Sequence, residues 1–339
     1  MKKKIIVFVL LAFGALNAFA ISEINYQKNF DSKIIPFLSS MKSAFFQGQN
    51  HIAIHYRTFL QPRAKTCLVV LPGRSEPIEK YAELVFDLVH KDSGKDLNIF
   101  LMDHRGQGSS ERLSTPLDLG YVDNFSNYIA DVETFVKLQK LDQICEHKFL
   151  LAHSLGAGIG VGFILKHPHV FDRVAIISPM LKILTKPYSY NIARAIVDSF
   201  IFTGHGAQFA LGQKGFNPNV EFENNTVTSS RERFFMSMGT YEAYPETKLG
   251  GVSNKWIHEV MVGTNAIRSR YHEIDTPLRV FHAGHESFSE TSEMKKICDE
   301  ARDCKRFFYP SAKHEILMEK DQTRDGVIDL LNGFFSTAI

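Results

Sequence analysis

Residues 150–158, Leu-Leu-Ala-His-Ser-Leu-Gly-Ala-Gly, place Ser154 between an apolar run and a glycine-rich segment. A strand that turns sharply into a helix exposes a serine hydroxyl at the end of a sheet, where it can act as a nucleophile. Such a turn needs small neighbours, and Ala152 and Gly156 meet that need, although glycine is more usual at the position of Ala152. The alternative is that Ser154 only caps the N-terminus of the helix.

A serine hydroxyl needs a general base, and the base needs a carboxylate to orient it. His314 is the candidate base because it lies in a loop between an expected strand, residues 305–310, and the last expected helix. Glu286 is the candidate acid because it follows an apolar strand in the loop 284–288. It also lies between Ser154 and His314 in the chain, which is the order that this arrangement uses.

Other residues near these positions are weaker candidates. Glu290 is an alternative acid, but it lies in the expected first turn of the next helix, where an acid is favoured anyway. His153 precedes Ser154 in the chain, but adjacency in the sequence does not by itself direct its ring at the serine hydroxyl. His282 and His285 flank the acid loop, and we interpret both as structural.

The attack of a hydroxyl on a carbonyl carbon creates a negative oxygen, which two backbone N–H groups must face. Losing one such donor costs roughly 10²–10³ in rate. We expect one N–H from Leu155, directly after the candidate nucleophile, and the other from Arg74, in the loop after an apolar strand. The alternative for the loop that carries Arg74 is an ordinary turn.

A second glycine-rich stretch, Met-Asp-His-Arg-Gly-Gln-Gly-Ser-Ser, occupies residues 102–110. It lacks the spacing and the lysine of a phosphate-binding loop. We interpret its Asp103, Gly106 and Gly108 as a tight structural turn beneath the site, with no chemistry of its own.

Apolar stretches that alternate with helical patterns predict the α/β class, because strands that are apolar throughout are buried in a parallel sheet. We expect a mostly parallel central sheet flanked by helices, preceded by an antiparallel hairpin over residues 42–59. Apolar residues at helical spacing predict helices over residues 125–141 and about 322–337. The expected buried strands are residues 66–73, 97–103, 147–154, 172–180 and 276–284.

The alternation of strands and helices stops after residue 180 and resumes near residue 274. Residues 181–273 therefore predict an inserted, mainly helical lid, with residues 21–180 and 274–339 as the two parts of one core. Within the lid, residues 188–211 could form a helix that touches a membrane surface, although packing within the lid is the commoner explanation.

The first twenty residues have the pattern of a secretory signal peptide: three lysines, an apolar run and Ala18-Phe19-Ala20. The alternative is an uncleaved membrane anchor, but the apolar run is short for a membrane-spanning helix. Cleavage after Ala20 removes three of the 39 Lys and Arg residues and none of the 37 Asp and Glu residues. The remaining chain is close to neutral, which argues against a nucleic-acid partner.

Export implies an oxidising compartment for the four cysteines. Cys298 and Cys304 are the candidate disulfide because they are close in sequence, between a helical stretch and a strand. Cys67 and Cys145 lie in or near apolar strands, and we expect both to be buried free thiols. The sequence has no Cys-x-x-Cys pair and no histidine-rich cluster, so we expect no metal and no cofactor.

Four segments together resemble the bacterial lysophospholipase branch of the α/β-hydrolases, which is close to the monoacylglycerol lipases. They are LPGRSEPIEKYAELVFDL, MDHRGQGSSER, LLAHSLGAG and KHEILMEKD. The resemblance covers nearly all of the chain after the first twenty residues and extends into the expected lid, at TVTSSRERFF and LGGVSNKWIHE. It implies an α/β-hydrolase fold with Ser154 as nucleophile, Glu286 as acid and His314 as base. It assigns no role to Arg231, Trp256 or Glu259.

The resemblance also implies a substrate class, a small-molecule ester of a single-chain lipid whose acyl chain the lid shelters. We therefore expect an exported lysophospholipase, periplasmic or secreted, whose lid is its point of transient contact if it associates with a membrane. A monoacylglycerol lipase and a general carboxylesterase are alternatives within the same chemistry. A non-catalytic α/β-hydrolase that binds a ligand is the alternative from another class.

Overall fold

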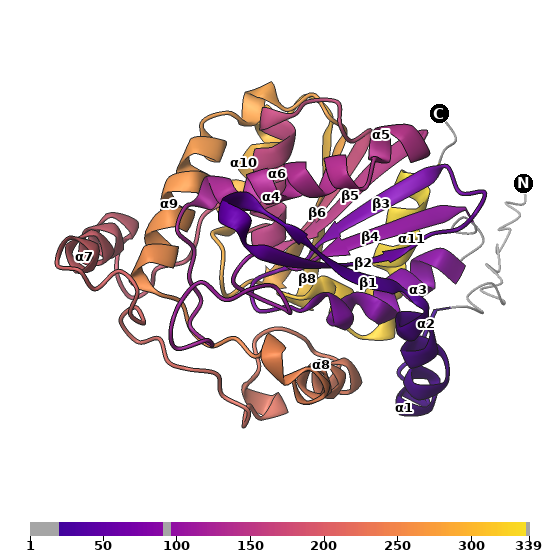
Figure 1. Cartoon of the computed structure of the whole chain (residues 1–339), viewed down its shortest axis with the longest axis horizontal. Coiled ribbons are helices and arrows are strands. Elements are labelled where there is room, and N and C mark those ends of the chain that lie inside the picture. The colour runs from indigo at the N-terminus through magenta and orange to yellow at the C-terminus, as the bar shows by residue number, and fades with distance from the viewer. Residues whose placement is uncertain (1–19, 91–95, 337–339) are drawn as a thin grey trace, which may run out of the picture.

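The computed structural model describes residues 20–90 and 96–336, which form a layered α/β structure around one sheet (Figure 1). Apart from Ala20, the predicted signal peptide lies outside the described residues. Within those ranges, no helix is long and apolar enough to cross a membrane.

The sheet has eight strands in the described ranges, in the order β1-β2-β4-β3-β5-β6-β7-β8. The hairpin strands β1 and β2 are antiparallel to each other and β2 is antiparallel to β4, whereas all other neighbours are parallel. This arrangement confirms the predicted hairpin and the mostly parallel sheet. The strands are β1 Lys42–Gln47, β2 Ala53–Phe59, β3 Thr66–Leu71, β4 Leu97–Met102, β5 His147–His153, β6 Arg173–Ile177, β7 Leu278–His285 and β8 Cys304–Lys313.

Helices cover both faces of the sheet, and each face has its own apolar cluster. On one face lie α4 (Phe125–Leu138), α6 (Ser154–Lys166), α9 (Asn254–Arg268) and α10 (Thr291–Glu300). On the other lie α1 (Tyr26–Asn29), α2 (Ile35–Ser40), α3 (Ala82–His90) and α11 (Asp321–Phe335). Burial from two sides explains why β4, with the sequence LNIFLM, is buried at every residue. The predicted fold class is confirmed.

Shorter elements complete the described chain. The remaining α-helices are α5 (Leu141–Ile144), α7 (Tyr190–Phe202) and α8 (Arg231–Ala243), and a π-helical turn, η1, spans Phe30–Ile34. The 3₁₀ turns are η2 (Gln49–His51), η3 (Ile78–Tyr81), η4 (Phe222–Asn224), η5 (Pro245–Thr247), η6 (Tyr271–Glu273) and η7 (Ile316–Met318).

The β6–β7 segment, residues 178–277, holds α7, α8 and α9 and, within the described residues, no strand beyond isolated bridges. Serines begin all three helices: the hydroxyls of Ser189, Ser230 and Ser253 each accept a hydrogen bond from the backbone N–H three residues ahead. Helix α9 packs against α4 and α6 in the core, whereas α7 and α8 lie outside the sheet layers (Figure 1).

The ends of β7 and β8 are offset by an irregularity in their pairing. Ala283 pairs with Tyr309, but His285, only two residues later, pairs with Lys313. Gly284 allows this close approach, because a Cβ at that position would lie 2.1 Å from the carbonyl oxygen of Pro310. The offset extends β8 beyond the predicted residues 305–310 as far as Lys313. It therefore brings the residues that follow the two strands, Glu286 and His314, side by side.

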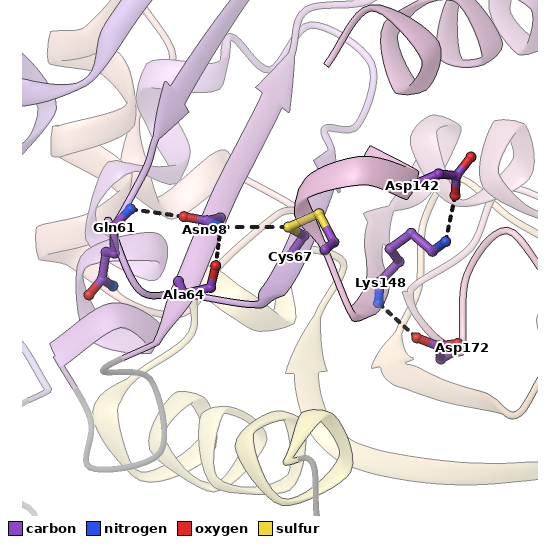
Figure 2. The surroundings of a disulfide bond; sticks show 8 residues. Gln61, Ala64, Cys67, Asn98, Asp142, Lys148 and Asp172 are labelled. Carbon is purple, nitrogen blue, oxygen red and sulfur yellow. Dashed lines mark hydrogen bonds and ion pairs between the residues drawn. A yellow bond between two sulfur atoms is a disulfide. The ribbon is translucent and has the colours of Figure 1, made fainter. Parts of the chain in front are cut away.

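The structure contains two disulfides, Cys298–Cys304 and Cys67–Cys145. The expectation of free thiols at Cys67 and Cys145 was therefore wrong. Cys67 lies at the start of β3 and Cys145 just before β5, and these two strands are parallel neighbours whose first residues pair. Their Cα atoms are 5.8 Å apart, within the usual range for a disulfide. Figure 2 shows the Asn98 side chain directed at Cys67, with its amide nitrogen 3.7 Å from the sulfur.

Removing the two disulfides should have unequal effects on stability. Cys67–Cys145 closes a loop of 78 residues and Cys298–Cys304 one of 6. In the loop-entropy model, the first contributes roughly 4 kcal/mol to the free energy of unfolding and the second roughly 2 kcal/mol. Urea unfolding of the paired Cys→Ala variants should show this ranking. Equal losses would show that entropy of the unfolded chain is not the dominant cause.

Candidate active site

Three side chains that are far apart in sequence form one chain of hydrogen bonds. The Nε2 atom of His314 lies 2.9 Å from the hydroxyl oxygen of Ser154. Its Nδ1 atom lies 2.8 and 2.7 Å from the two carboxylate oxygens of Glu286. With the ring proton on Nδ1 held by Glu286, Nε2 is free to accept the hydroxyl proton of Ser154. This is the geometry of a nucleophile, its base and the acid that orients the base.

Ser154 lies at a sharp turn between β5 and α6. Its φ of 48° is in the left-handed region, which is strained for a residue with a side chain. Gly156 makes the tight approach possible, because a Cβ there would lie 2.4 Å from the carbonyl oxygen of Pro72. The turn thus has the strand–turn–helix form expected from the sequence, and Ser154 begins the helix itself rather than capping it.

The carboxylate of Glu286 is fully buried, and His314 is nearly so. Burial alone would raise the pKa of Glu286, but the hydrogen bond and the charge of His314 lower it below its usual range. The backbone N–H groups of Phe288 and Ser289 also donate to Glu286 and lower its pKa further. Glu286 therefore remains an anion that can stabilise a protonated His314.

The remaining predicted residues lie as follows. Arg74 and Ser154 line the same cavity, of about 110 Å³, beside His314. Leu155 is the second residue of α6, where backbone N–H groups have no partner within the helix. The Arg74 guanidinium is not directed at Ser154, since both of its terminal nitrogens donate to the carbonyl oxygen of Gly250. Only its backbone N–H is then a candidate for binding an oxyanion.

Asp103, Gly106 and Gly108 form a turn behind the site. The two glycines have φ values of 76° and 56°, and a side chain at Gly108 would collide with the Asp103 carboxylate. That carboxylate accepts hydrogen bonds from the backbone N–H groups of Ile78 and Ser109 and contacts the ring of His55.

The other candidates lie apart from the hydrogen-bonded chain. Glu290 immediately precedes α10, and the ring of His282 contacts Arg306. Arg231 forms an exposed ion pair with Glu223. Two more residues support the core: Trp256 donates to the hydroxyl of Tyr128, and Glu259 accepts from the backbone N–H of Phe125.

Sequence reasoning missed a buried carboxylate, Glu76, that joins the loops of the site. It accepts hydrogen bonds from the backbone N–H of Gly73 at 2.7 Å and from Tyr81 at 2.6 Å. It also contacts Nδ1 of His153 at 2.7 Å and Nζ of Lys80 at 2.8 Å. Glu76 thus ties the loop that carries Arg74 to the residue that precedes the nucleophile.

Lys80 and His153 extend this network to the loop of the candidate base. Lys80 also contacts the carboxylate of Glu315 at 2.6 Å, and Nε2 of His153 lies 3.4 Å from the carbonyl oxygen of His314. Burial opposes the charge on Glu76, but Lys80 and His153 hold its pKa well below the usual range. Burial likewise opposes the charge on His153, and Glu76 raises its pKa.

A signal for this network was present in the sequence. Glu76 and Lys80 have the i, i+4 spacing of a helical ion pair, and His153 and Glu315 each adjoin a predicted catalytic residue. Their meeting depends on three loops from different parts of the chain, which local patterns do not reveal.

A Glu76→Gln variant should lose both stability and rate. The change leaves His153 without its anion and Lys80 with Glu315 alone, and breaking one partner of a buried ion pair costs roughly 3–5 kcal/mol. A small shift of the loops that Glu76 joins should lower kcat by on the order of 10²-fold. Urea unfolding and steady-state kinetics measure the two effects.

Glu79→Gln is the matched control for this prediction. Glu79 is also buried and also paired, with Arg57 at 2.9 Å, and it lies three residues after Glu76, in η3. This variant should lose stability while kcat stays near the parent value. Equal losses of kcat in both variants would reduce Glu76 to a purely structural role.

The comparisons with known proteins identify the family of this chain. Residues 62–321 match the model of the family described as "Serine aminopeptidase, S33", so the chain belongs to that family. It is a serine hydrolase of the α/β-hydrolase class, and the resemblance seen in the sequence is confirmed. A carboxylic ester hydrolase is the class of enzyme that the family and the relatives support.

Two similar relatives are bacterial. Lysophospholipase L2 of Escherichia coli K12 is 27% identical over 307 residues, which cover 88% of this chain and 89% of that protein. The probable lysophospholipase L2 of Haemophilus influenzae is 26% identical over 314 residues, covering 90% and 95%. A solved structure, a soluble variant of monoglyceride lipase from Saccharomyces cerevisiae with a substrate analogue, has a TM-score of 0.67 at 17% identity. It covers 87% of this chain and 94% of its own, and it shows the shared fold.

Proposed function

We propose that this protein is an exported serine esterase that cleaves single-chain lipid esters, with a lysophospholipid as its substrate. The observation that carries the proposal is the hydrogen-bonded chain of Ser154, His314 and Glu286. The substrate class is supported by two relatives that are named lysophospholipases and that match nearly the whole chain.

In the proposed mechanism, Nε2 of His314 takes the Ser154 proton as the hydroxyl oxygen attacks the acyl carbonyl carbon. The backbone N–H groups of Leu155 and Arg74 bind the resulting oxyanion, and Glu286 stabilises the protonated imidazole. His314 then protonates the departing alcohol, which leaves an acyl-enzyme. A water molecule, deprotonated by His314, attacks that ester and releases the fatty acid.

The space around Ser154 suits an amphiphilic substrate. The cavity at Ser154 shares Arg74, Ser75, Val227 and Glu315 with a neighbouring cavity of about 380 Å³. Apolar and polar side chains both line the larger cavity: Phe216, Val220, Phe234, Met238, Leu249, Asn217, Asn224, Ser237 and Tyr241. Most of these side chains belong to residues 181–273, which we propose form the lid; its helices α7 and α8 lie outside the sheet layers, whereas α9 packs in the core. Transient contact of this lid with a membrane surface is part of the same proposal.

Export is supported by the pattern of residues 1–20 and by the two disulfides, because disulfides persist in oxidising compartments. We therefore place the enzyme in the periplasm or outside the cell, where monoacyl lipids derived from phospholipids are available.

The test compares three substrates with the exported protein and its Ser154→Ala variant. Fatty acid release from lysophosphatidylcholine that disappears in Ser154→Ala would establish both the substrate class and the nucleophile. Preference for monooleoylglycerol would assign a monoacylglycerol lipase, and activity on p-nitrophenyl butyrate alone would assign a general carboxylesterase. A protein that turns over none of them and is not labelled at Ser154 by a fluorophosphonate would be a ligand-binding member of the family.

A further inference from the structure

The residue that would follow signal-peptide cleavage is held inside the fold. Ile21 is 2% exposed and packs in the apolar cluster that also holds α2, α3 and α11. Its backbone nitrogen donates to the carboxylate of Asp87 at 3.0 Å, and its carbonyl oxygen accepts from Arg233 at 2.9 Å. Chain termini are usually loose unless something ties them down, so this degree of anchoring needs a reason.

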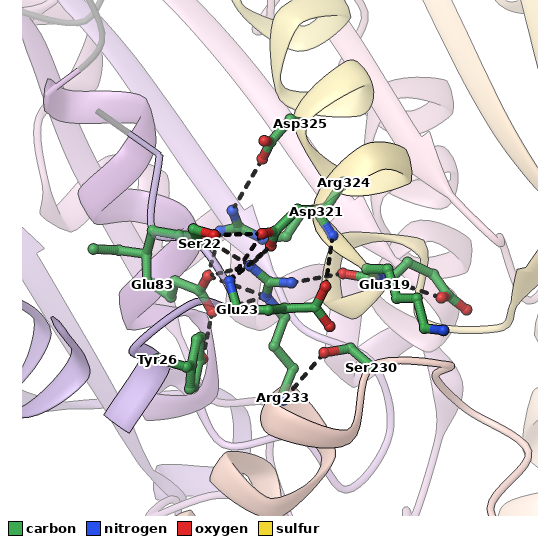
Figure 3. A network of polar contacts seen from close by, with 12 residues as sticks. Ser22, Glu23, Tyr26, Glu83, Ser230, Arg233, Glu319, Asp321, Arg324 and Asp325 are labelled. Carbon is green, nitrogen blue, oxygen red and sulfur yellow. Dashed lines mark hydrogen bonds and ion pairs between the residues drawn. The ribbon is translucent and has the colours of Figure 1, made fainter. Parts of the chain in front are cut away.

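The next residues are anchored as well. The hydroxyl of Ser22 and the backbone N–H of Glu23 both donate to the carboxylate of Asp321, at 2.7 and 2.9 Å. Figure 3 shows Arg233 of α8 lying among Glu83, Glu319 and Asp321, so that α3, α8 and α11 meet at this point. The start of the described chain is thus part of a built polar cluster.

The cluster contains more negatively charged than positively charged side chains. Arg233 and Arg324, both fully buried, face the buried carboxylates of Glu83 and Asp87 and the partly buried carboxylate of Asp321. Asp325 and Glu23 add further negative charge at the edge of the cluster. Arg324 is shared between Asp87, at 2.6 Å, and Glu83, at 3.4 Å, and a buried carboxylate whose charge is only partly compensated is costly. One more positive charge next to Asp87 would bring the cluster nearer to balance.

We propose that cleavage after Ala20 creates an α-ammonium group on Ile21, which forms a buried ion pair with Asp87 and locks the start of the mature chain into the fold. The inference rests on the proposed export. A signal peptidase hydrolyses the Ala20–Ile21 peptide bond with one water molecule: the C–N bond breaks, the water oxygen joins the Ala20 carbonyl carbon as a carboxylate, and the nitrogen of Ile21 takes up protons. The backbone N–H of Ile21, a single uncharged donor to Asp87, thereby becomes an ammonium group with three N–H donors.

The electrostatics of Asp87 support this role. With an uncharged amide at Ile21, the pKa of Asp87 is raised to about 6. Burial is the largest cause; the charge of Arg324 lowers the pKa and that of Glu83 raises it. An ammonium group at Ile21 would stabilise the carboxylate and lower that pKa. The titratable and charged groups that face the site from the packed elements are Glu23, Tyr26, Glu83, Arg233, Asp321, Arg324 and Asp325.

The first measurement is the mass and N-terminal sequence of the protein recovered after expression of the full gene in a bacterial host. The expected chain begins at Ile21 with a free α-amine. Retention of the leader, or a start at any other residue, would overturn the proposal. This readout involves no substrate, so its failure is distinguishable from a failure of the proposed esterase activity.

The second measurement moves the charge without removing any side chain. One Gly is inserted between Ala20 and Ile21, so that processing leaves an uncharged amide at Ile21. The insertion should lower the melting temperature by roughly 5 °C at pH 7. In an Asp87→Asn background the same insertion should change it little. An equal decrease in both backgrounds would contradict an ion pair with Asp87.

The pH dependence gives an independent check that needs no Asp87 variant. Ion pairing should raise the pKa of the α-ammonium above its ordinary value of about 7.7–8.0, so its stabilising effect is complete below that value and is lost as the pH rises through the raised pKa. In the insertion variant the pKa of Asp87 stays raised, so the free energy of unfolding should fall as the pH rises from about 4 to 6. The melting-temperature gap should therefore be widest between about pH 6 and 8, and a constant gap would overturn the proposal.

Discussion

A His314→Gln variant should hydrolyse the substrate ester with a kcat roughly 10⁵- to 10⁶-fold below that of the parent, the loss typical of a serine hydrolase without its base. Glutamine has similar size and can still donate a hydrogen bond, but it cannot take the proton that Nε2 accepts from the Ser154 hydroxyl at 2.9 Å. The fold should persist, because the neighbouring network of Glu76, Lys80 and Glu315 keeps all of its charges. Single-turnover kinetics with a chromogenic ester and a thermal unfolding curve measure the two properties.

His282→Gln is the matched control for this variant. His282 is a buried histidine on β7, and its ring contacts Arg306 rather than Ser154. Its replacement should leave kcat within a few-fold of the parent. If His314→Gln kept a kcat similar to that of His282→Gln, His314 would not be the base.

A Glu286→Gln variant should lower kcat by roughly 10⁴-fold, with little change in the position of His314. The amide can offer its N–H to Nδ1 and so favour the wrong tautomer, and it provides no charge to stabilise the protonated imidazole. Glu286→Asp should recover part of the rate, because a carboxylate is kept. Glu290→Gln is the control, since Glu290 lies at the start of α10 and should not affect kcat.

The same variant has a predictable effect on stability at low pH. The pKa of Glu286 is lowered in the folded protein, so its contribution to the free energy of unfolding is present above the unfolded pKa, about 4.3, and is lost as the pH falls through the lowered value. The difference in stability between the parent and Glu286→Gln should therefore disappear in strong acid. A difference that grew on acidification would contradict this pairing.

Local patterns in the sequence were sufficient for the fold and for three residues that the structure brings together, whose catalytic roles stay predictions. Strands such as β3 and β4 are apolar at all but one residue, which distinguishes them from amphipathic elements. Because the carboxyl ends of parallel strands lie at one edge of a sheet, the sequence predicts that residues following β5, β7 and β8 lie together. The chain order of Ser154, Glu286 and His314 then selected one residue of each type.

Features that depend on spatial neighbours could not be predicted in this way. The bond between Cys67 and Cys145 requires knowing that β3 and β5 are adjacent in the sheet. The role of Glu76 requires the loops after β3, β5 and β8 to meet, and the extension of β8 depends on its pairing with β7. These contacts join segments far apart in the chain, so the spacing of Glu76 and Lys80 indicates an ion pair but no local pattern reveals which loops meet.

The left-handed backbone conformation at Ser154 implies a trade-off between activity and thermal stability. Holding a residue with a side chain in this conformation costs on the order of 1–2 kcal/mol, a cost that glycine would not bear. A Ser154→Gly protein would be relieved of that strain but would lose the hydroxyl that we propose as the nucleophile. A selection for heat resistance that ignored turnover would therefore favour loss of the proposed nucleophile.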